Sequence, residues 1–125
     1  MHKIAIIEDV EDNRDLLYYL LRDEFKVTRF SSGEEALRHF AVDTPDLILL
    51  DIWLPGMDGV EVLKRLRQHE HLRNIPVLAL TAHAMLGDRE KYLSAGFDEY
   101  ASKPLVDLTG FVGIVRRLLT SSEPV

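Results

Sequence analysis

Three short runs of purely apolar residues, at positions 4–7, 47–50 and 77–80, constrain the fold of this chain more than any other feature of its sequence. None of the runs alternates between apolar and polar residues, as a strand with one face in water does. A continuous apolar run bounded by polar or turn-forming residues predicts a strand that is buried on both faces. Two more polar segments, at 26–30 and 98–102, are typical of strands at the edges of a sheet.

Segments with helical periodicity follow the predicted strands, at about residues 14–23, 33–41, 58–66, 86–95 and 108–119. Ser32 is a suitable N-cap for the second segment, with Glu35 three residues later, and Gly96 is a suitable stop for the fourth. Strands that alternate with helices predict a parallel sheet covered on both faces, and right-handed crossovers leave few topologies. We therefore expect an α/β fold, with a doubly wound five-stranded parallel sheet in the flavodoxin-like order 2-1-3-4-5 and five helices.

The composition is typical of one folded domain. Of the 125 residues, 46% are apolar and 29% are charged, which excludes a disordered or fibrous chain. The net charge of −6, without a basic run, disfavours direct binding to nucleic acid or to an anionic membrane. The absence of cysteine excludes disulfides and thiolate-bound metals. We expect residues 1–120 to form the domain and residues 121–125 a short tail. The cytoplasm is the expected compartment, since no signal peptide or membrane-spanning run is found.

Charged and polar residues stand where the predicted strands end. Glu8 and Asp9 follow the first strand, Asp51 the third, Thr81 the fourth and Lys103 the fifth. The carboxyl ends of parallel strands lie at the same edge of a sheet, and ligands bind there, at the point where the strand order reverses. We therefore expect these five side chains to converge. Each of them alone would be an ordinary turn, cap or surface residue, so the prediction depends on their joint placement.

Such a cluster predicts a magnesium-dependent phosphoryl site. Three carboxylates repel one another unless a cation binds between them, and Mg²⁺ prefers oxygen ligands of this kind. The ion would favour an anion beside it, Lys103 would bind one phosphoryl oxygen, and Thr81 would donate a hydrogen bond to another. Asp51, at the end of the central strand, is then the expected nucleophile, which would form an aspartyl phosphate.

Five short motifs occur in order along the chain. They are the acidic pair Glu8-Asp9, the segment PDLILLD at 45–51, the segment LPGMDG at 54–59, the pair Thr81-Ala82, and the segment DEYASKP at 98–104. In this combination the chain strongly resembles the receiver domain of two-component response regulators, from residue 3 to about residue 119. The resemblance leaves open whether the natural protein is a single domain or part of a longer chain.

The resemblance implies a role for each residue of the predicted cluster. Asp51 matches the phosphoacceptor, Asp9 the direct Mg²⁺ ligand, and Glu8 the acid that holds the ion, directly or through water. The backbone carbonyl of Trp53 takes the third protein-ligand position, and Lys103 matches the phosphate-binding lysine.

The resemblance also implies a conformational switch. Thr81 and Tyr100 stand where the family has its switch pair, in which the hydroxyl moves to the phosphoryl group and the aromatic ring turns inward. Trp53 and His83 stand where family members tune the lifetime of the phosphoryl group. The surface expected to change includes the fourth helix and the fifth strand, around Met85, Leu86, Tyr92 and Tyr100.

The expected function is therefore a signalling switch that takes a phosphoryl group from a histidine kinase or a phosphotransfer protein. It would catalyse only its own phosphorylation and dephosphorylation. The signal would pass to an unidentified protein, and one form of output would be a dimer that assembles on phosphorylation. The alternative is a phosphorylation-independent interaction module of the same fold, which a loss of Asp9, Asp51 or Lys103 would favour; all three are present. A phosphatase is disfavoured because Trp53 stands where such enzymes often carry a second aspartate. A flavin site is disfavoured by the acidic segment 8–12.

Overall fold

The computed structural model describes residues 1–82, 85–103 and 106–121, in which five strands alternate with five helices. The strands are β1 (Lys3–Ile7), β2 (Lys26–Phe30), β3 (Leu47–Asp51), β4 (Val77–Thr81) and β5 (Glu99–Ser102). The helices are α1 (Glu11–Leu21), α2 (Gly33–Phe40), α3 (Gly59–Gln68), α4 (Asp88–Ala95) and α5 (Leu108–Ser121). The expected alternation of strands and helices is confirmed.

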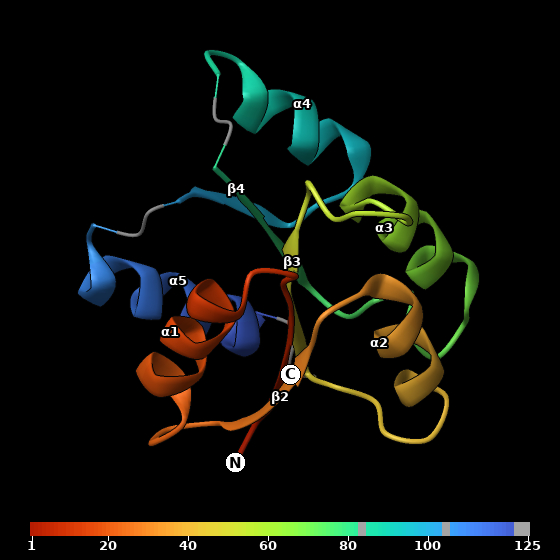
Figure 1. The fold of residues 1–125 in the computed structure, drawn as a ribbon, viewed down its shortest axis with the longest axis horizontal. Helices are drawn as coiled ribbons and strands as arrows, with labels where there is room; N and C mark the ends of the chain where they lie inside the picture. The colour runs from red at the N-terminus through yellow and green to blue at the C-terminus, as the bar shows by residue number, and fades with distance from the viewer. Residues whose placement is uncertain (83–84, 104–105, 122–125) are drawn as a thin grey trace.

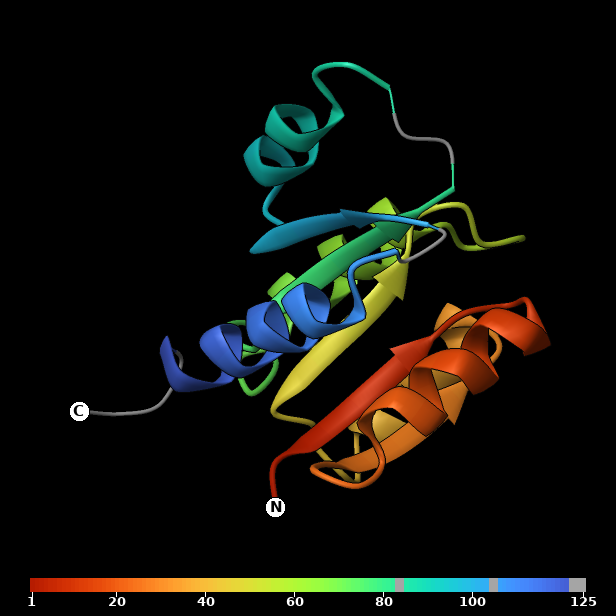
Figure 2. The same cartoon turned by 90° about the vertical axis from the view of Figure 1, so that its left-hand side faces the viewer.

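All strand pairs are parallel, and their order is β2-β1-β3-β4-β5, as expected. The register pairs Ile7 of β1 with Leu50 of β3, and Asp51 of β3 with Leu80 of β4, so the central strands end at nearly the same level. Figure 1 shows α1 and α5 on one side of the sheet and α2 and α3 on the other. In Figure 2, α1 and α5 lie in front of the strands. The sheet is therefore doubly wound.

Alternate side chains of the central strands enter two separate cores. Ile4 and Ile6 of β1 pack in the core that α1 and α5 cover, whereas Ala5 and Ile7 pack in the core that α2, α3 and α4 cover. Full burial of an aliphatic side chain contributes roughly 1.5–3 kcal/mol to folding. Strands that have a helical layer on each face therefore require apolar residues at every position, which explains the continuous apolar runs.

Two of the predicted helix ends are confirmed in detail. The Ser32 hydroxyl accepts a hydrogen bond from the Glu35 backbone N–H at 3.2 Å, at the start of α2. Gly96 ends α4 with a φ of 116°, a conformation that glycine adopts without strain. The helix α4 begins at Asp88, two residues later than expected, because the Asp88 carboxylate accepts the Met85 backbone N–H at 2.8 Å and closes a turn before the helix.

Other element boundaries also differ slightly from the prediction; for example, α1 spans Glu11–Leu21 where about 14–23 was expected. The strand β5 begins at Glu99, one residue later than expected, and the carboxylate of the preceding Asp98 accepts the backbone N–H of Val77 at 2.8 Å. The helix α5 reaches Ser121, the first residue of the predicted tail. In the described part of the chain, no helix combines the length and the apolar character that crossing a membrane requires.

Candidate functional site

The carboxyl ends of four strands bring together the residues that the sequence singled out. Glu8 directly follows β1, Asp51 ends β3, Thr81 ends β4, and Lys103 directly follows β5. Glu8, Asp51 and Thr81 are buried. The backbone N–H of Lys103 donates to the Thr81 carbonyl at 2.7 Å, which continues the ladder between β4 and β5 and places Lys103 at the sheet edge. Convergence at this edge is therefore a direct result of the strand order.

The ammonium group of Lys103 forms ion pairs with two buried carboxylates. The Lys103 Nζ lies 2.5 Å from Glu8 Oε1 and 3.2 Å from Asp51 Oδ2, and only 11% of the Lys103 side chain is exposed. Asp9, which is exposed, adds a third carboxylate. One oxygen from each of the three acids lies within 4.8 Å of the others. The local charge is then negative when all three acids are ionised, despite the lysine.

The same three carboxylates fit a metal ion. Among the described residues, Glu8 Oε2 is buried and has no hydrogen-bond partner, which leaves one buried oxygen lone-pair site unused. Oxygen ligands from a few carboxylates, with one side open to water, suit Mg²⁺, which retains several of its waters in protein sites. Glu8, Asp9 and Asp51 could therefore hold Mg²⁺, and the ion would compensate their mutual repulsion.

The pKa values reflect the shortage of positive charge. Burial, together with the neighbouring Asp51 carboxylate, outweighs the effect of Lys103 and raises the pKa of Glu8 to about 7. Burial also acts to lower the pKa of Lys103, but the hydrogen bond to Glu8 and the charges of Asp51 and Glu8 outweigh it and raise that pKa. The ammonium is thus held in its charged form at the centre of the site.

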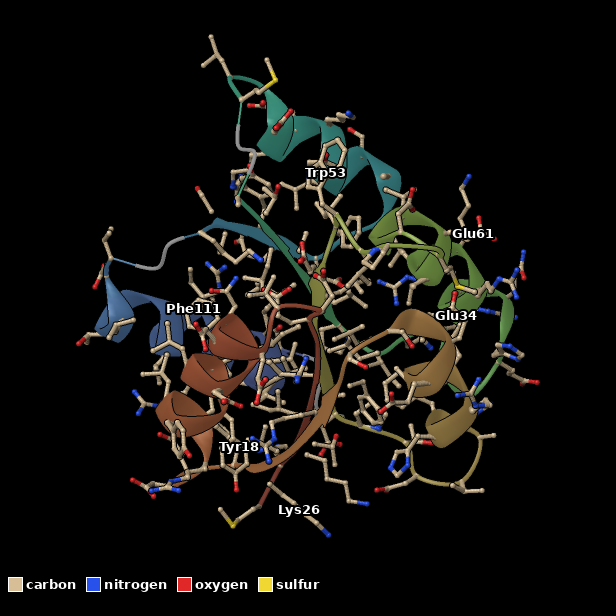
Figure 3. The ribbon with its side chains drawn as sticks, in the orientation of Figure 1. Tyr18, Lys26, Glu34, Trp53, Glu61 and Phe111 are labelled. Carbon is tan, nitrogen blue, oxygen red and sulfur yellow. The ribbon has the colours of Figure 1, made fainter. Side chains whose placement is uncertain are left out.

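The loop after β3 holds Asp51 in place. The backbone N–H of Trp53 donates to Asp51 Oδ1 at 3.1 Å. Gly59, which begins α3, lies so close to this loop that an added Cβ would stand 2.6 Å from the Asp51 carbonyl oxygen. Only glycine allows this approach. Trp53 is 59% exposed, and Figure 3 shows it beyond the end of β3, away from Phe111, Glu34 and Glu61.

The predicted switch residue Tyr100 lies outside the carboxylate cluster. Its ring stacks on Tyr92 with a centroid distance of 5.7 Å, and its hydroxyl is buried without a hydrogen-bond partner among the described residues. Met85 and Leu86 are exposed, as expected, but Tyr92 is only 5% exposed and belongs to the core. The expectation that Tyr92 lies on a readable surface is therefore wrong, because its ring packs against Phe97 and Tyr100. His83 lies outside the described residues.

One residue beside the site was missed by sequence reasoning. The Arg14 Nη1 donates to the backbone carbonyl of Glu8 at 2.9 Å and approaches that of Asp9 at 3.4 Å. Arg14 is the only cationic residue between Glu8 and Asp15, and this could have served as a signal. The helical pattern instead indicated only that it lies off the apolar stripe of α1.

Comparisons with known proteins show the family to which this chain is similar. Residues 4–112 match the family described as the response regulator receiver domain. The polar-differentiation response regulator DivK of Brucella ovis (strain ATCC 25840 / 63/290 / NCTC 10512) is 45% identical over 103 residues, which cover 82% of this chain and 84% of the relative.

Two solved structures are also similar to this chain. A putative response regulator from Chloroflexus aurantiacus J-10-fl has a TM-score of 0.88 at 33% identity and covers 95% of this chain and 98% of its own. The receiver domain of a sensor histidine kinase from Pseudomonas aeruginosa PAO1, whose structure has a magnesium ion coordinated in its active-site cleft, has a TM-score of 0.85 at 33% identity with the same coverage.

Proposed function

This chain belongs to the response regulator receiver domain family, and from that premise we propose that it is a phosphoryl-accepting signalling switch with Asp51 as the acceptor. One observation carries the proposal. The Asp51 carboxylate is buried at the end of the central strand, 3.2 Å from the Lys103 ammonium, in a cluster whose carboxylates outnumber its cations. Such an arrangement is suited to a divalent cation and a transferred phosphoryl group. An ion pair that only stabilises the fold would not require an excess of carboxylates.

The metal site would be formed by Asp9 and Asp51, by Glu8 directly or through water, and by the Trp53 backbone carbonyl. When bound, Mg²⁺ supplies positive charge that compensates the carboxylates and the phosphoryl oxygens. The hydrogen bond from the Trp53 N–H to Asp51 Oδ1 orients the acceptor carboxylate, so that Oδ2 lies on the side of Lys103.

In the transfer step, an oxygen of Asp51 forms a bond to phosphorus while the bond between phosphorus and the donor's histidine nitrogen breaks. The imidazole leaves with its electron pair and is then protonated. Lys103 binds one phosphoryl oxygen, and Thr81 donates its hydroxyl hydrogen to another. Later attack by water on phosphorus returns the free carboxylate and inorganic phosphate. The protein therefore promotes its own phosphorylation and dephosphorylation and is not a turnover enzyme.

The lifetime of the aspartyl phosphate would depend on the residues around it. Trp53 and His83 occupy the positions that flank the phosphoryl group in the family. The exposed Trp53 indole would hinder the attacking water, and the His83 imidazole would shield the group or orient that water.

The signal would pass through Thr81 and Tyr100 to the surface of α4 and β5. Movement of the Thr81 hydroxyl toward the phosphoryl group would favour a second packing of Tyr100 against this region. Exposed Met85 and Leu86 would belong to the surface that changes. The donor would be a sensor histidine kinase or a histidine phosphotransfer protein in the cytoplasm, and the reader a protein or a second copy of residues 1–120.

Intact mass spectrometry after incubation with Mg²⁺ and phosphoramidate tests the proposal. We expect one added phosphoryl group, which is absent without Mg²⁺ and absent in Asp51→Asn. The matched control is Asp46→Asn, because this exposed aspartate precedes the same strand and accepts the Lys3 backbone N–H at 2.7 Å, away from the carboxylate cluster. This variant should be phosphorylated normally. If Asp51→Asn still gains the adduct, the phosphoacceptor is a residue other than Asp51. If the wild-type protein neither gains an adduct nor binds beryllofluoride, a phosphorylation-independent interaction module becomes the better proposal.

A further inference from the structure

Arg14 contacts the whole loop between β1 and α1. Its backbone N–H donates to the Val10 carbonyl at 3.0 Å, as the first hydrogen bond of the helix. Its side-chain Nη1 donates to the Glu8 carbonyl at 2.9 Å and approaches the Asp9 carbonyl at 3.4 Å. One residue therefore serves the carbonyl oxygens of three consecutive residues, and two of these carry carboxylates of the candidate metal site.

This loop is attached to the rest of the fold from both sides. On one side the Glu8 backbone N–H donates to the Phe30 carbonyl of β2 at 3.0 Å, so the sheet holds the start of the loop. On the other side the Arg14 guanidinium donates to the Glu8 carbonyl and approaches that of Asp9. Without the guanidinium, the carbonyls of Glu8 and Asp9 lose this protein donor, and the loop would adopt more backbone conformations.

The position of the Asp9 carboxylate should be affected most by the loss of the Arg14 guanidinium. Glu8 is fully buried and is held by Lys103 at 2.5 Å, whereas Asp9 is exposed. The position of the Asp9 carboxylate therefore depends mainly on the path of its own backbone. A metal ligand on a loosely held loop binds its ion weakly, because the ligand must be ordered when the ion binds.

We propose that Arg14 is a positioning residue for the metal ion. Its side chain holds the backbone of Glu8 and Asp9 so that the carboxylates of these residues are already directed at the ion when it binds. This inference rests on the proposed function, since it takes the Glu8, Asp9 and Asp51 cluster to be a Mg²⁺ site. Arg14 acts through hydrogen bonds to main-chain oxygens and contacts neither the ion nor the phosphoryl group.

Calorimetric titration with MgCl₂ alone, without any phosphodonor, tests the inference. We expect Arg14→Ala to weaken Mg²⁺ binding about 10-fold, the effect typical of losing a residue that orients a metal ligand. Arg22→Ala is the matched control, since it removes the same charge from the other end of α1, where Arg22 is exposed and lies over the Tyr19 ring. Its Mg²⁺ affinity should equal that of the wild-type protein.

Arg14→Lys separates positioning from charge. Lysine keeps the positive charge, but its shorter side chain cannot make the same contacts with both carbonyls. Loss of a positive charge by itself would strengthen the binding of a cation, so the effect of charge opposes the result expected for Arg14→Ala. We expect the weaker binding to persist in Arg14→Lys. Full recovery of affinity in Arg14→Lys would overturn the positioning role, and so would wild-type affinity in Arg14→Ala.

Two measurements keep the outcome interpretable. Thermal unfolding of each variant in EDTA shows whether it is folded, and Arg14→Gln takes the place of Arg14→Ala if the alanine variant is not. If the wild-type protein itself binds no Mg²⁺, the metal site of the proposed function is wrong and the inference is overturned with it. If the wild-type protein binds Mg²⁺ and the Arg14 variants bind it equally well, only the inference is wrong.

Discussion

Glu8 and Glu99 are both buried carboxylates attached to strands, yet their surroundings are opposite. Glu8 shares the single Lys103 ammonium with Asp51, and its Oε2 has no hydrogen-bond partner among the described residues. Glu99, at the start of β5, accepts the Tyr100 backbone N–H at 3.1 Å and pairs with two guanidinium groups. Arg89 of α4 lies 3.0 Å from its Oε1, and Arg117 of α5 lies 2.6 Å from its Oε2.

The pKa values of the two glutamates shift in opposite directions. Burial raises the pKa of Glu8 to about 7, because Lys103 does not compensate for it. Burial also acts to raise the pKa of Glu99, but the Tyr100 N–H and the two arginines outweigh it and hold that pKa below its usual value. A buried carboxylate that serves the fold is thus compensated within the chain. One that is left short of positive charge is suited to a cation from outside.

The partners of the two glutamates also differ in their exposure. The arginine side chains around Glu99 are 58% and 61% exposed, whereas Lys103 is 11% exposed. Arg89 and Arg117 can therefore be hydrated if Glu99 is removed, and the loss of free energy is moderate. The Lys103 ammonium lies among carboxylates, and water has little access to hydrate it if one of them is removed.

Removal of the compensated carboxylate should have the largest effect on stability. We expect Glu99→Ala to lower the free energy of unfolding by about 2 kcal/mol, because charge-assisted hydrogen bonds that join α4, β5 and α5 are lost. Urea denaturation measures this loss. Glu90→Ala is the control, since Glu90 is exposed on α4, next to Arg89, and should change stability by less than about 0.5 kcal/mol. Equal stability of the two variants would show that the Glu99 cluster contributes nothing to the fold.

Neutralisation of the uncompensated carboxylate should have the opposite sign. In EDTA at pH 8, we expect Glu8→Gln to raise the free energy of unfolding by about 1 kcal/mol, because the buried charge disappears while Lys103 keeps Asp51 as its partner. Urea denaturation again gives the value. The control is Glu11→Gln, an exposed glutamate in the first turn of α1. A clear loss of stability in Glu8→Gln would mean that the pair with Lys103 is as well compensated as Glu99, and the contrast would fail.

The pH dependence of the Glu99 cluster should give the smallest effect. A carboxyl group with a lowered folded-state pKa contributes stability above its unfolded value of 4.5, and this contribution is lost as the pH falls through the folded value. We expect Glu99→Gln to be about 0.5 kcal/mol less stable than the wild-type protein at neutral pH. The difference should shrink as the pH falls, in denaturation curves measured from pH 7 to pH 3. A difference independent of pH would assign the effect of the substitution to packing.

Most of the fold could be predicted from local patterns. The apolar runs at 4–7, 47–50 and 77–80 have no polar face, so they require helices on both sides of the sheet. This requirement and the right-handed crossover rule leave few topologies, and the expected flavodoxin-like order among them is the one observed. The convergence of Glu8, Asp51 and Lys103 then follows, because each stands directly at the end of its strand.

The misses share one physical cause. The family resemblance implied that Tyr92 belongs to the surface that changes, yet its ring packs against Phe97 and Tyr100. Arg14 and Glu99 act through partners that no periodicity indicates, namely main-chain carbonyls and guanidinium groups from two other helices. A long side chain carries its polar end far from its own backbone, so what it contacts depends on packing.

The sequence by itself therefore determined the sheet, its two helical layers and the acidic edge at its carboxyl end, since these depend on hydrophobic periodicity and on which residue follows each strand. Only the tertiary structure decided how charge is shared within that frame. It placed one ammonium between Glu8 and Asp51, two guanidinium groups on Glu99, and the Arg14 side chain on the loop that carries Asp9. The reason is that electrostatic compensation depends on distances of a few ångströms between residues far apart in the chain, and those distances exist only after the helices have packed.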